Sequence, residues 1–191
     1  FYILYMKYFI TVLAVIVSLQ SLAQQKPTEM DKSPMDVSYC PANFPILKMN
    51  GKVKDKEEPI ARVLYSRPQK NGRPIFGGIV RYGDVWRMGA NEATEIDIFK
   101  PVKIGNKILP KGRYTMYAVT SENKWTIIFN ADRDIWGLAH TERKDILKID
   151  VPVEQTAEVV EAFTIYFEPM KGGSKMMILW DNCRAGVPMY Y

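Results

Sequence analysis

Short apolar segments with the alternation of β-strands follow one another through most of the chain. Between Thr94 and Phe99, Ile96 and Ile98 fall on one face of an extended strand, and acidic residues fall on the other. Residues 176–180 are apolar at every position, as expected of a strand that is buried on both faces. The same reasoning predicts strands over residues 62–66, 94–99, 113–120, 125–129, 146–151, 163–167 and 176–180.

Turn-forming residues separate these segments. Gly and Asn supply the backbone conformations that tight turns need, and Pro fixes the entry to a turn. No apolar run keeps a period of about 3.6 residues over several turns. We therefore expect at most one or two short helices, around residues 141–145 or 155–160. The predicted turns lie at residues 105–106, 110–112, 121–124 and 171–175.

Strands joined by turns, without helical crossovers, pair antiparallel. Each strand has an apolar face that must be buried, and two packed layers of sheet achieve this. The sequence therefore predicts an all-β fold, an antiparallel two-layer β-sandwich of the jelly-roll or Greek-key kind. A closed barrel is the alternative.

The N-terminal segment has the pattern of a secretory signal peptide. Lys7 precedes an apolar run over residues 9–19, and the small residues Ser21 and Ala23 follow. We expect cleavage before Gln24 and a location in the periplasm, outside the cell or at the cell surface. An uncleaved membrane anchor is the competing hypothesis, but the apolar run is shorter than the roughly 20 residues that span a bilayer.

The rest of the chain predicts one domain. Met6 is the expected start of translation, and residues 1–5 are interpreted as an upstream extension, so the signal peptide covers residues 1–23. Residues 24–35 are polar and are predicted to form a linker. Residues 36–190 are predicted to form a single β-sandwich domain, along which the apolar residues of 36–47 lie.

Composition narrows the chemistry further. The chain has 191 residues, 47% hydrophobic and 25% charged, with a net charge of +5, which is an ordinary globular balance. This modest basicity, together with the expected export, disfavours nucleic-acid binding. The single histidine, His140, limits general acid–base and zinc chemistry, and we interpret it as a surface or half-buried residue. No cofactor and no metal site are predicted.

The two cysteines are too few for a disulfide-rich scaffold or a four-cysteine zinc site. In an oxidising compartment Cys40 and Cys183 can pair, which would tie the start of the domain to its last strand. Two separate buried thiols are the alternative.

One segment, residues 65–95, is unusually rich in aromatic, arginine and glycine residues. In a functional interpretation, the aromatic rings form a rigid wall, and the arginines bind a carboxylate, phosphate or sulfate. In a structural interpretation, the segment is a plug that caps one end of the sandwich, with its arginines paired to Asp84, Glu92 and Glu95. The aromatic and arginine residues concerned are Tyr65, Arg67, Arg73, Phe76, Arg81, Tyr82, Trp86 and Arg87.

Several motifs resemble those of the domain-of-unknown-function 2911 family of secreted or periplasmic proteins of Gram-negative bacteria. They are RVLYSRP, GRPIFGGIVRYGDVWRMGANEATEI, LPKGRYTMYAV, KWTIIFN, the Trp136-Gly137 pair and ILWDN, and the resemblance spans roughly residues 35–190. It implies a compact β-rich domain and export, and it brings no activity or catalytic residues. An aromatic residue more usually stands at the place of Cys40, and the place of Cys183 also tends to differ, so the resemblance says nothing about the disulfide.

We therefore expect an exported, non-catalytic binding or interaction module with an aromatic and arginine surface for an anionic or carbohydrate-like ligand. A periplasmic, glycosidase-like hydrolase that uses Glu92 with a second acid is one alternative. A structural subunit of an envelope complex, which would contact an envelope protein through this surface, is another. The predicted ligand-binding residues are Tyr65, Arg67, Arg73, Trp86, Arg87, Asn91 and Glu92.

Overall fold

The computed structural model describes residues 2–3, 5–6 and 27–191. The predicted signal peptide and its cleavage site fall largely on residues 7–26, which lie outside the described residues. Among the residues that are described, no helix has the length and apolar character needed to cross a bilayer. Residues Lys32–Tyr191 form one compact unit, which carries all the strands below.

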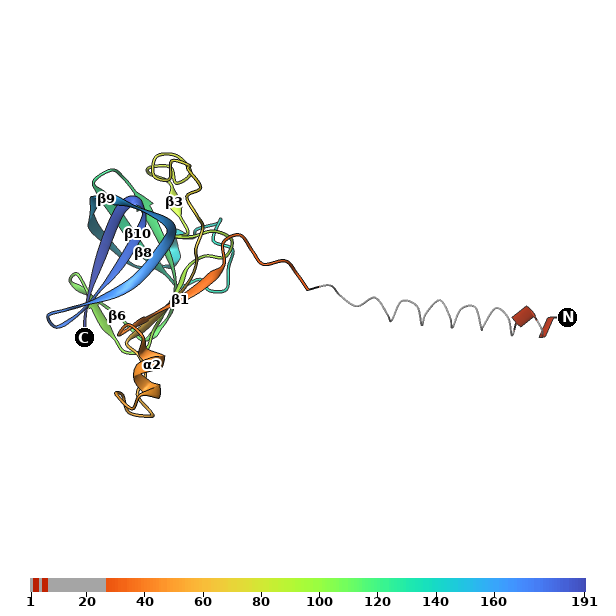
Figure 1. Cartoon of the computed structure of the whole chain (residues 1–191), viewed down its shortest axis with the longest axis horizontal. Coiled ribbons are helices and arrows are strands. Elements are labelled where there is room, and N and C mark those ends of the chain that lie inside the picture. The colour runs from red at the N-terminus through yellow and green to blue at the C-terminus, as the bar shows by residue number, and fades with distance from the viewer. Residues whose placement is uncertain (1, 4, 7–26) are drawn as a thin grey trace. The chain divides into compact units, whose positions relative to one another are not determined.

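This unit consists almost entirely of β-strands, joined by short turns and a few longer loops (Figure 1). Its helices are α2 (Phe44–Met49) and the 3₁₀ helix η1 (Glu142–Lys144). Its strands are β1 (Met35–Cys40), β2 (Ala61–Ser66), β3 (Val85–Trp86), β4 (Glu95–Ile98), β5 (Val102–Ile104), β6 (Lys107–Leu109), β7 (Gly112–Thr120), β8 (Lys124–Asn130), β9 (Asp145–Met170) and β10 (Gly173–Tyr190).

In the described part of the chain, these strands form a ten-stranded sheet in the order β1-β2-β4-β7-β8-β9-β10-β5-β6, with β3 paired to β7. Every pair of neighbouring strands is antiparallel. The predicted all-β, antiparallel class is therefore confirmed. The sheet is open, because β1 and β6 stand at the two ends of its path.

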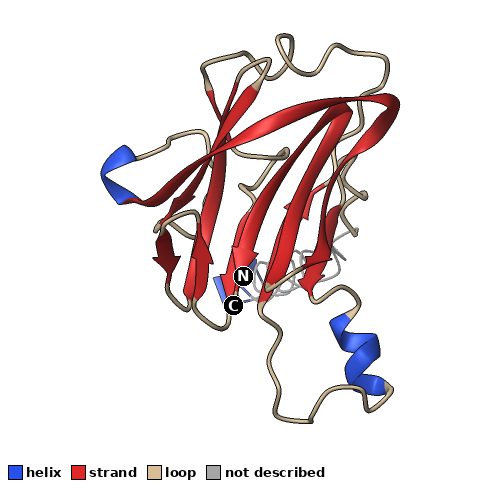
Figure 2. Ribbon diagram, turned by 90° about the vertical axis from the view of Figure 1, so that its left-hand side faces the viewer, coloured by secondary structure: helices blue, strands red, loops and turns tan. Residues whose placement is uncertain are grey.

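Strand β9 belongs to both halves of this sheet, and its curvature folds the sheet into two layers. Its first part pairs with β8 and its last part with β10, and the strand curves strongly between the two (Figure 2). The two halves of the sheet therefore face each other: Tyr65 of β2 packs edge-on against Phe163 of β9, with 5.8 Å between ring centroids. Two separate strands were predicted over residues 146–151 and 163–167, and both belong to this single strand.

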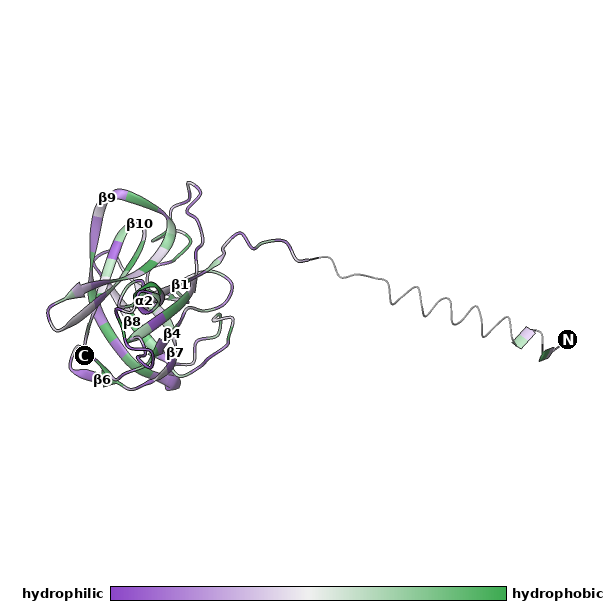
Figure 3. Cartoon of the chain, turned by 60° about the horizontal axis from the view of Figure 1, so that its bottom comes forward, coloured by the Kyte–Doolittle hydropathy of each residue, from purple (hydrophilic) through white to green (hydrophobic). Residues whose placement is uncertain are grey.

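The alternation that predicted the strands also explains the core. In β4, Ile96 and Ile98 are buried, whereas the acidic residues between and before them are half-buried. The colouring by hydropathy shows apolar and polar positions alternating along the strands (Figure 3). Buried residues from both halves of the sheet form one hydrophobic cluster, which fixes the two layers against each other.

The short helices agree only in part with the expectation. Helix η1 lies within the predicted range 141–145, but residues 155–160 belong to β9. Helix α2 was not predicted; it buries Phe44, which stacks on Tyr39 of β1 with 6.4 Å between centroids. A helix of six residues contains less than two turns, too few for a periodic pattern to stand out in the sequence.

The predicted disulfide between Cys40 and Cys183 is wrong. Both thiols are free and buried. The Sγ of Cys40 lies 3.6 Å from the Oη of Tyr191, whereas Cys183 stands eight residues earlier on the same chain, with its Sγ 3.3 Å from Nε2 of Gln155. Eight residues of extended strand span about 26 Å, far beyond the Cα separation that a disulfide allows. The alternative of two separate buried thiols holds.

Candidate functional site

The long connection between β2 and β4 carries an aromatic residue into the centre of the molecule. Trp86 lies in β3, which pairs with β7, and its ring is buried at the junction of the two layers. It packs edge-on against Phe163 of β9 at 5.1 Å and Trp125 of β8 at 6.2 Å, and stacks on Trp180 of β10 at 6.0 Å. Phe76, from the same connection, contacts Trp125 at 4.7 Å. These five residues form the aromatic cluster of the fold.

A pocket of about 350 Å³ opens over this cluster, and we call it the Trp86 pocket. This volume lies at the small end of the range of about 300–1,000 Å³ that small-molecule sites occupy. The residues that line it come from the connection between β2 and β4, from the loop after β8, from β10 and from the segment before β1. They are Ser33, Pro68, Arg73, Ile79, Val80, Val85, Trp86, Arg87, Gly89, Ala90, Gly137, Leu138 and Trp180.

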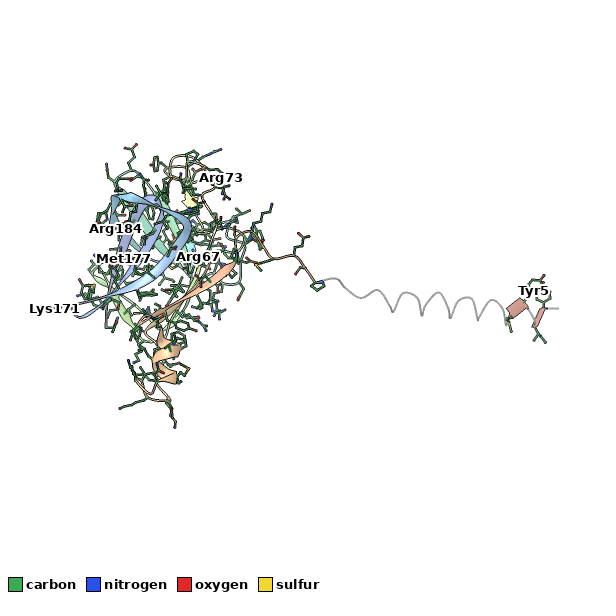
Figure 4. The ribbon with its side chains drawn as sticks, in the orientation of Figure 1. Tyr5, Arg67, Arg73, Lys171, Met177 and Arg184 are labelled. Atoms are coloured by element: carbon green, nitrogen blue, oxygen red, sulfur yellow. The ribbon has the colours of Figure 1, made fainter. Side chains whose placement is uncertain are left out.

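Arg73 is held at one side of the pocket by the backbone of its own loop. Its Nε donates to the carbonyl of Lys70 at 2.9 Å, and its Nη2 donates to the carbonyl of Gln69 at 2.6 Å. Lys70 in turn donates to the carbonyl of Arg73 and pairs with Asp181 of β10 at 3.0 Å, so the loop is tied to the sheet. Arg73 lies on the loop near β3, away from Arg67 (Figure 4). Its guanidinium is therefore positioned before any ligand binds.

Arg87 stands at another side of the same pocket. Its guanidinium carbon lies 5.7 Å from the centre of the Trp136 ring, and its Nη1 donates to the Trp136 carbonyl at 3.4 Å. Burial lowers the pKa of Arg87 and the nearby carboxylate of Glu92 raises it, with burial the larger effect. The side chain remains charged at neutral pH, because arginine does not lose its proton in proteins.

The loop after β8 forms the wall beside Arg87. Gly137 and Leu138 line the pocket, and the amide of Ala93 donates to the carbonyl of Ile135 at 3.1 Å. Gly137 has a φ of +79°, and a Cβ at this position would lie 2.6 Å from the Cβ of Ala93. This wall therefore depends on a glycine that lets two segments approach closely.

Three of the seven predicted site residues line the Trp86 pocket: Arg73, Trp86 and Arg87. Tyr65 is buried and does not line the pocket, and its hydroxyl donates to the carbonyl of Ile165 at 3.1 Å. Arg67 connects three segments: it donates to Asp36 at 3.1 Å, to Thr164 and to the carbonyl of Phe163. These contacts engage Tyr65 and Arg67 within the fold, but Arg67 pairs with Asp36 and not with the acids that the plug interpretation named.

The two remaining predicted residues lie in the turn before β4. Asn91 is half-buried and has a φ of +58°, in the left-handed region that Asn tolerates. Glu92 is exposed and interacts with Arg87 through its charge. Neither is among the residues that line the pocket.

Sequence reasoning missed the part of the pocket that comes from other elements. Trp180 was assigned to a buried strand, and Trp136 and Gly137 appeared only within the family motifs. Leu138 lies 52 residues after Trp86, and Trp180 lies 94 residues after it. No spacing rule connects positions that far apart, so only the pairing of the strands brings them together.

His140, at the end of the same loop, is half-buried. Its Nε2 donates to Oδ1 of Asp145 at 2.7 Å, and its ring packs edge-on against Tyr117 at 4.8 Å. The Nδ2 of Asn130 donates to the same oxygen at 2.7 Å, and Nζ of Lys148 lies 3.0 Å from Oδ2. This hydrogen-bonded cluster ties the loop to the start of β9. No group of His, Cys, Asp and Glu that could hold a metal occurs among the residues the structure describes.

We expect Asp145 to make the protein sensitive to acid. Burial raises the pKa of its carboxyl group, but the hydrogen bonds from Asn130, His140 and Lys148 outweigh it and keep the pKa below the usual 3.8. A lowered pKa stabilises the fold at pH values above the unfolded pKa, and that stabilisation is lost as pH falls through the folded pKa. The free energy of unfolding of Asp145→Asn should therefore be lower than that of the wild type at about pH 6, and the difference should shrink toward about pH 2. Urea denaturation between these pH values measures the free energy of unfolding of the wild type and of Asp145→Asn. A difference that stays constant with pH would contradict a lowered pKa of Asp145.

Comparison with known proteins identifies the family to which this chain belongs. The family model described as a protein of unknown function, DUF2911, matches residues 49–189. Neither the curated proteins nor the solved structures gave a match. The matched range covers more than two thirds of the chain and contains β2 to β9, all but the last residue of β10, and every pocket residue except Ser33. The chain therefore belongs to the DUF2911 family, as its motifs suggested.

Proposed function

We propose that this protein is an exported binding module that holds a small anionic ligand in the Trp86 pocket. The observation that carries the proposal is the placement of two arginines, Arg73 and Arg87, at one pocket over an aromatic floor. Charge-assisted hydrogen bonds from a guanidinium to an oxyanion are among the strongest in proteins. The signal-peptide pattern of residues 1–23 supports export to the periplasm or cell surface.

The charge of the pocket favours an anion. The described residues that line it include two arginines and no aspartate or glutamate. Backbone carbonyls hold Arg73 in place, and Trp136 holds Arg87. Binding of a ligand therefore costs little side-chain conformational entropy at either arginine. A hydrolase that acts through Glu92 is less well supported, because Glu92 is exposed and does not line the pocket. A glycosidase also needs two carboxylates that flank one bond.

The proposal predicts that the double variant Arg73→Gln, Arg87→Gln loses anion binding. Each lost charged hydrogen bond should weaken binding about tenfold to a hundredfold. Thermal unfolding of the full chain with and without cyclohexanecarboxylate, glucuronate, inorganic phosphate and sulfate measures this. An anion at about 100 times its dissociation constant should stabilise the wild type by about 2.7 kcal/mol.

Arg184→Gln is the matched control. Arg184 is exposed and pairs with Glu154 at 2.6 Å, and it does not line the Trp86 pocket. This variant should respond to the anions as the wild type does. If none of the four anions stabilises the wild type, or if the double variant responds equally, the proposed function is wrong.

A further inference from the structure

We infer that the ligand of the Trp86 pocket is a carboxylate carried on a compact apolar body, and not a sugar acid or an inorganic oxyanion. The inference rests on the proposed function and narrows its ligand class. It depends on three features of the pocket besides its two charges: an apolar floor, an apolar rim and few side-chain hydrogen-bond acceptors.

The floor presents indole rings whose polar atoms are already engaged. The Nε1 of Trp86 donates to the carbonyl of Gly89 at 3.3 Å, and the Nε1 of Trp180 donates to the carbonyl of Glu161 at 3.1 Å. The two rings stack with an interplanar angle of 20°. Because both N–H groups bond within the protein, the rings offer a ligand apolar surface and no donor.

The rim is apolar and exposed. Ile79 is 50% exposed, Val85 43% and Leu138 78%, and all three line the pocket. Apolar side chains gathered around a concave site indicate contact with a ligand, since each exposed patch costs free energy in water. Covering this rim with an apolar body would gain about 25 cal/mol for each Å² removed from water.

The same lining is poorly suited to a sugar. Ser33 is the one side-chain hydroxyl among the described residues that line the pocket, and no amide or carboxylate side chain joins it. The hydroxyls of a sugar need acceptors as well as donors when they leave water, and an unpaired buried hydroxyl costs about 1–3 kcal/mol. The apolar side chains of the rim would offer these hydroxyls no acceptor.

An inorganic oxyanion would use the arginines alone. Phosphate or sulfate would leave the indole floor and the rim of Ile79 and Leu138 in water, so it would gain nothing from them. A carboxylate on a single apolar ring can use the arginines and the apolar lining together. Its oxygens bind the guanidinium groups, and its ring covers the indole floor and the apolar rim.

A matched set of probes tests this on the full chain by isothermal titration calorimetry. Cyclohexanecarboxylate and glucuronate are both six-membered rings with a carboxylate, and they differ in the hydroxyls. Cyclohexanecarboxylate should bind about tenfold more tightly than glucuronate or inorganic phosphate. Its neutral counterpart, cyclohexanecarboxamide, should bind about tenfold more weakly than the carboxylate.

A rim variant gives an independent measurement. Leu138→Ser should weaken cyclohexanecarboxylate binding about threefold to tenfold and leave the binding of phosphate unchanged. Ile108→Ser is the matched control: Ile108 is 67% exposed on β6 and does not line the pocket. Because both side chains are exposed, neither change should unfold the protein.

The outcomes separate the inference from the proposed function. Glucuronate or phosphate could bind as tightly as cyclohexanecarboxylate, with this binding lost in the arginine double variant. In that case the pocket is an anion site, but the inference of a carboxylate on an apolar body is wrong. Equal binding of the carboxamide, or an unchanged affinity in Leu138→Ser, overturns the inference as well. If no probe binds, the proposed function itself fails.

Discussion

Replacing Trp125 with alanine should lower the free energy of unfolding by about 3–5 kcal/mol. Trp125 is fully buried in β8, and its ring contacts Phe76 at 4.7 Å and Trp86 at 6.2 Å. Removing it leaves a cavity at the point where the two layers meet the aromatic cluster, and the sheet on either side cannot collapse into it. Urea denaturation at neutral pH measures the loss.

Two other substitutions make the test specific. Trp136→Ala removes the same side chain from a position that is 53% exposed, and it should cost less than about 1 kcal/mol. Trp125→Phe should cost less than Trp125→Ala, because the ring is largely kept and because the Nε1 of Trp125 has no hydrogen-bond partner in the described structure. Equal losses in Trp125→Ala and Trp136→Ala would contradict the central role of the cluster.

Replacing Gly137 with alanine should lower the free energy of unfolding by about 2–4 kcal/mol. Its φ of +79° strains any other residue, and the added Cβ would lie 2.6 Å from the Cβ of Ala93 and 3.0 Å from that of Arg87. The wall of the pocket would have to move away from Arg87. We therefore also expect weaker anion binding in this variant, measured by the same calorimetric titration as the wild type.

Gly51→Ala is the matched control for this prediction. Gly51 also has a positive φ, +66°, but nothing lies within 4 Å of the added Cβ. It should show the backbone strain alone, about 1 kcal/mol, and no change in anion binding. If the two glycine variants lose the same free energy of unfolding, the close approach between Gly137 and Ala93 does not limit the packing of this wall.

Trp86 is a poor choice for testing ligand binding, although it forms the floor of the pocket. Its ring packs against Phe163, Trp125 and Trp180, so an alanine at this position removes part of the core together with the site. Loss of binding in Trp86→Ala would not distinguish the two effects. The arginine and rim variants avoid this difficulty, because their side chains stand outside the core cluster.

The alternation of apolar and polar residues was sufficient to predict most strands. Ile96 and Ile98 of β4 follow the pattern of a strand with one buried face, and the turn at Gly105-Asn106 joins β5 to β6 as expected. The full length of β10 was not predicted, because the apolar run that indicated this strand ends at Trp180 and Asp181 follows it. In the structure Asp181 adopts a φ of +55° at a bulge, and the strand continues beyond it.

The candidate site was predictable only in part. The density of rings and guanidinium groups in residues 65–92 singled out Trp86, Arg73 and Arg87, which do share a pocket. Tyr65 and Arg67 have the same side-chain chemistry, but they are used within the fold, by Ile165, Asp36 and Phe163. Residue type states which contacts a side chain can make, and it does not state whether the fold already makes them.

The sequence by itself determined the β class, the family and the segment that supplies most of the residues lining the Trp86 pocket, because these follow from local alternation and from contiguous motifs. The tertiary structure decided the rest. It showed that β9 belongs to both layers, that Cys40 of β1 and Cys183 of β10 contact different residues, and that Trp180 and Leu138 complete the pocket with Trp86. These facts depend on contacts between residues far apart in the chain, which arise only when the strands pair and the two halves of the sheet pack together.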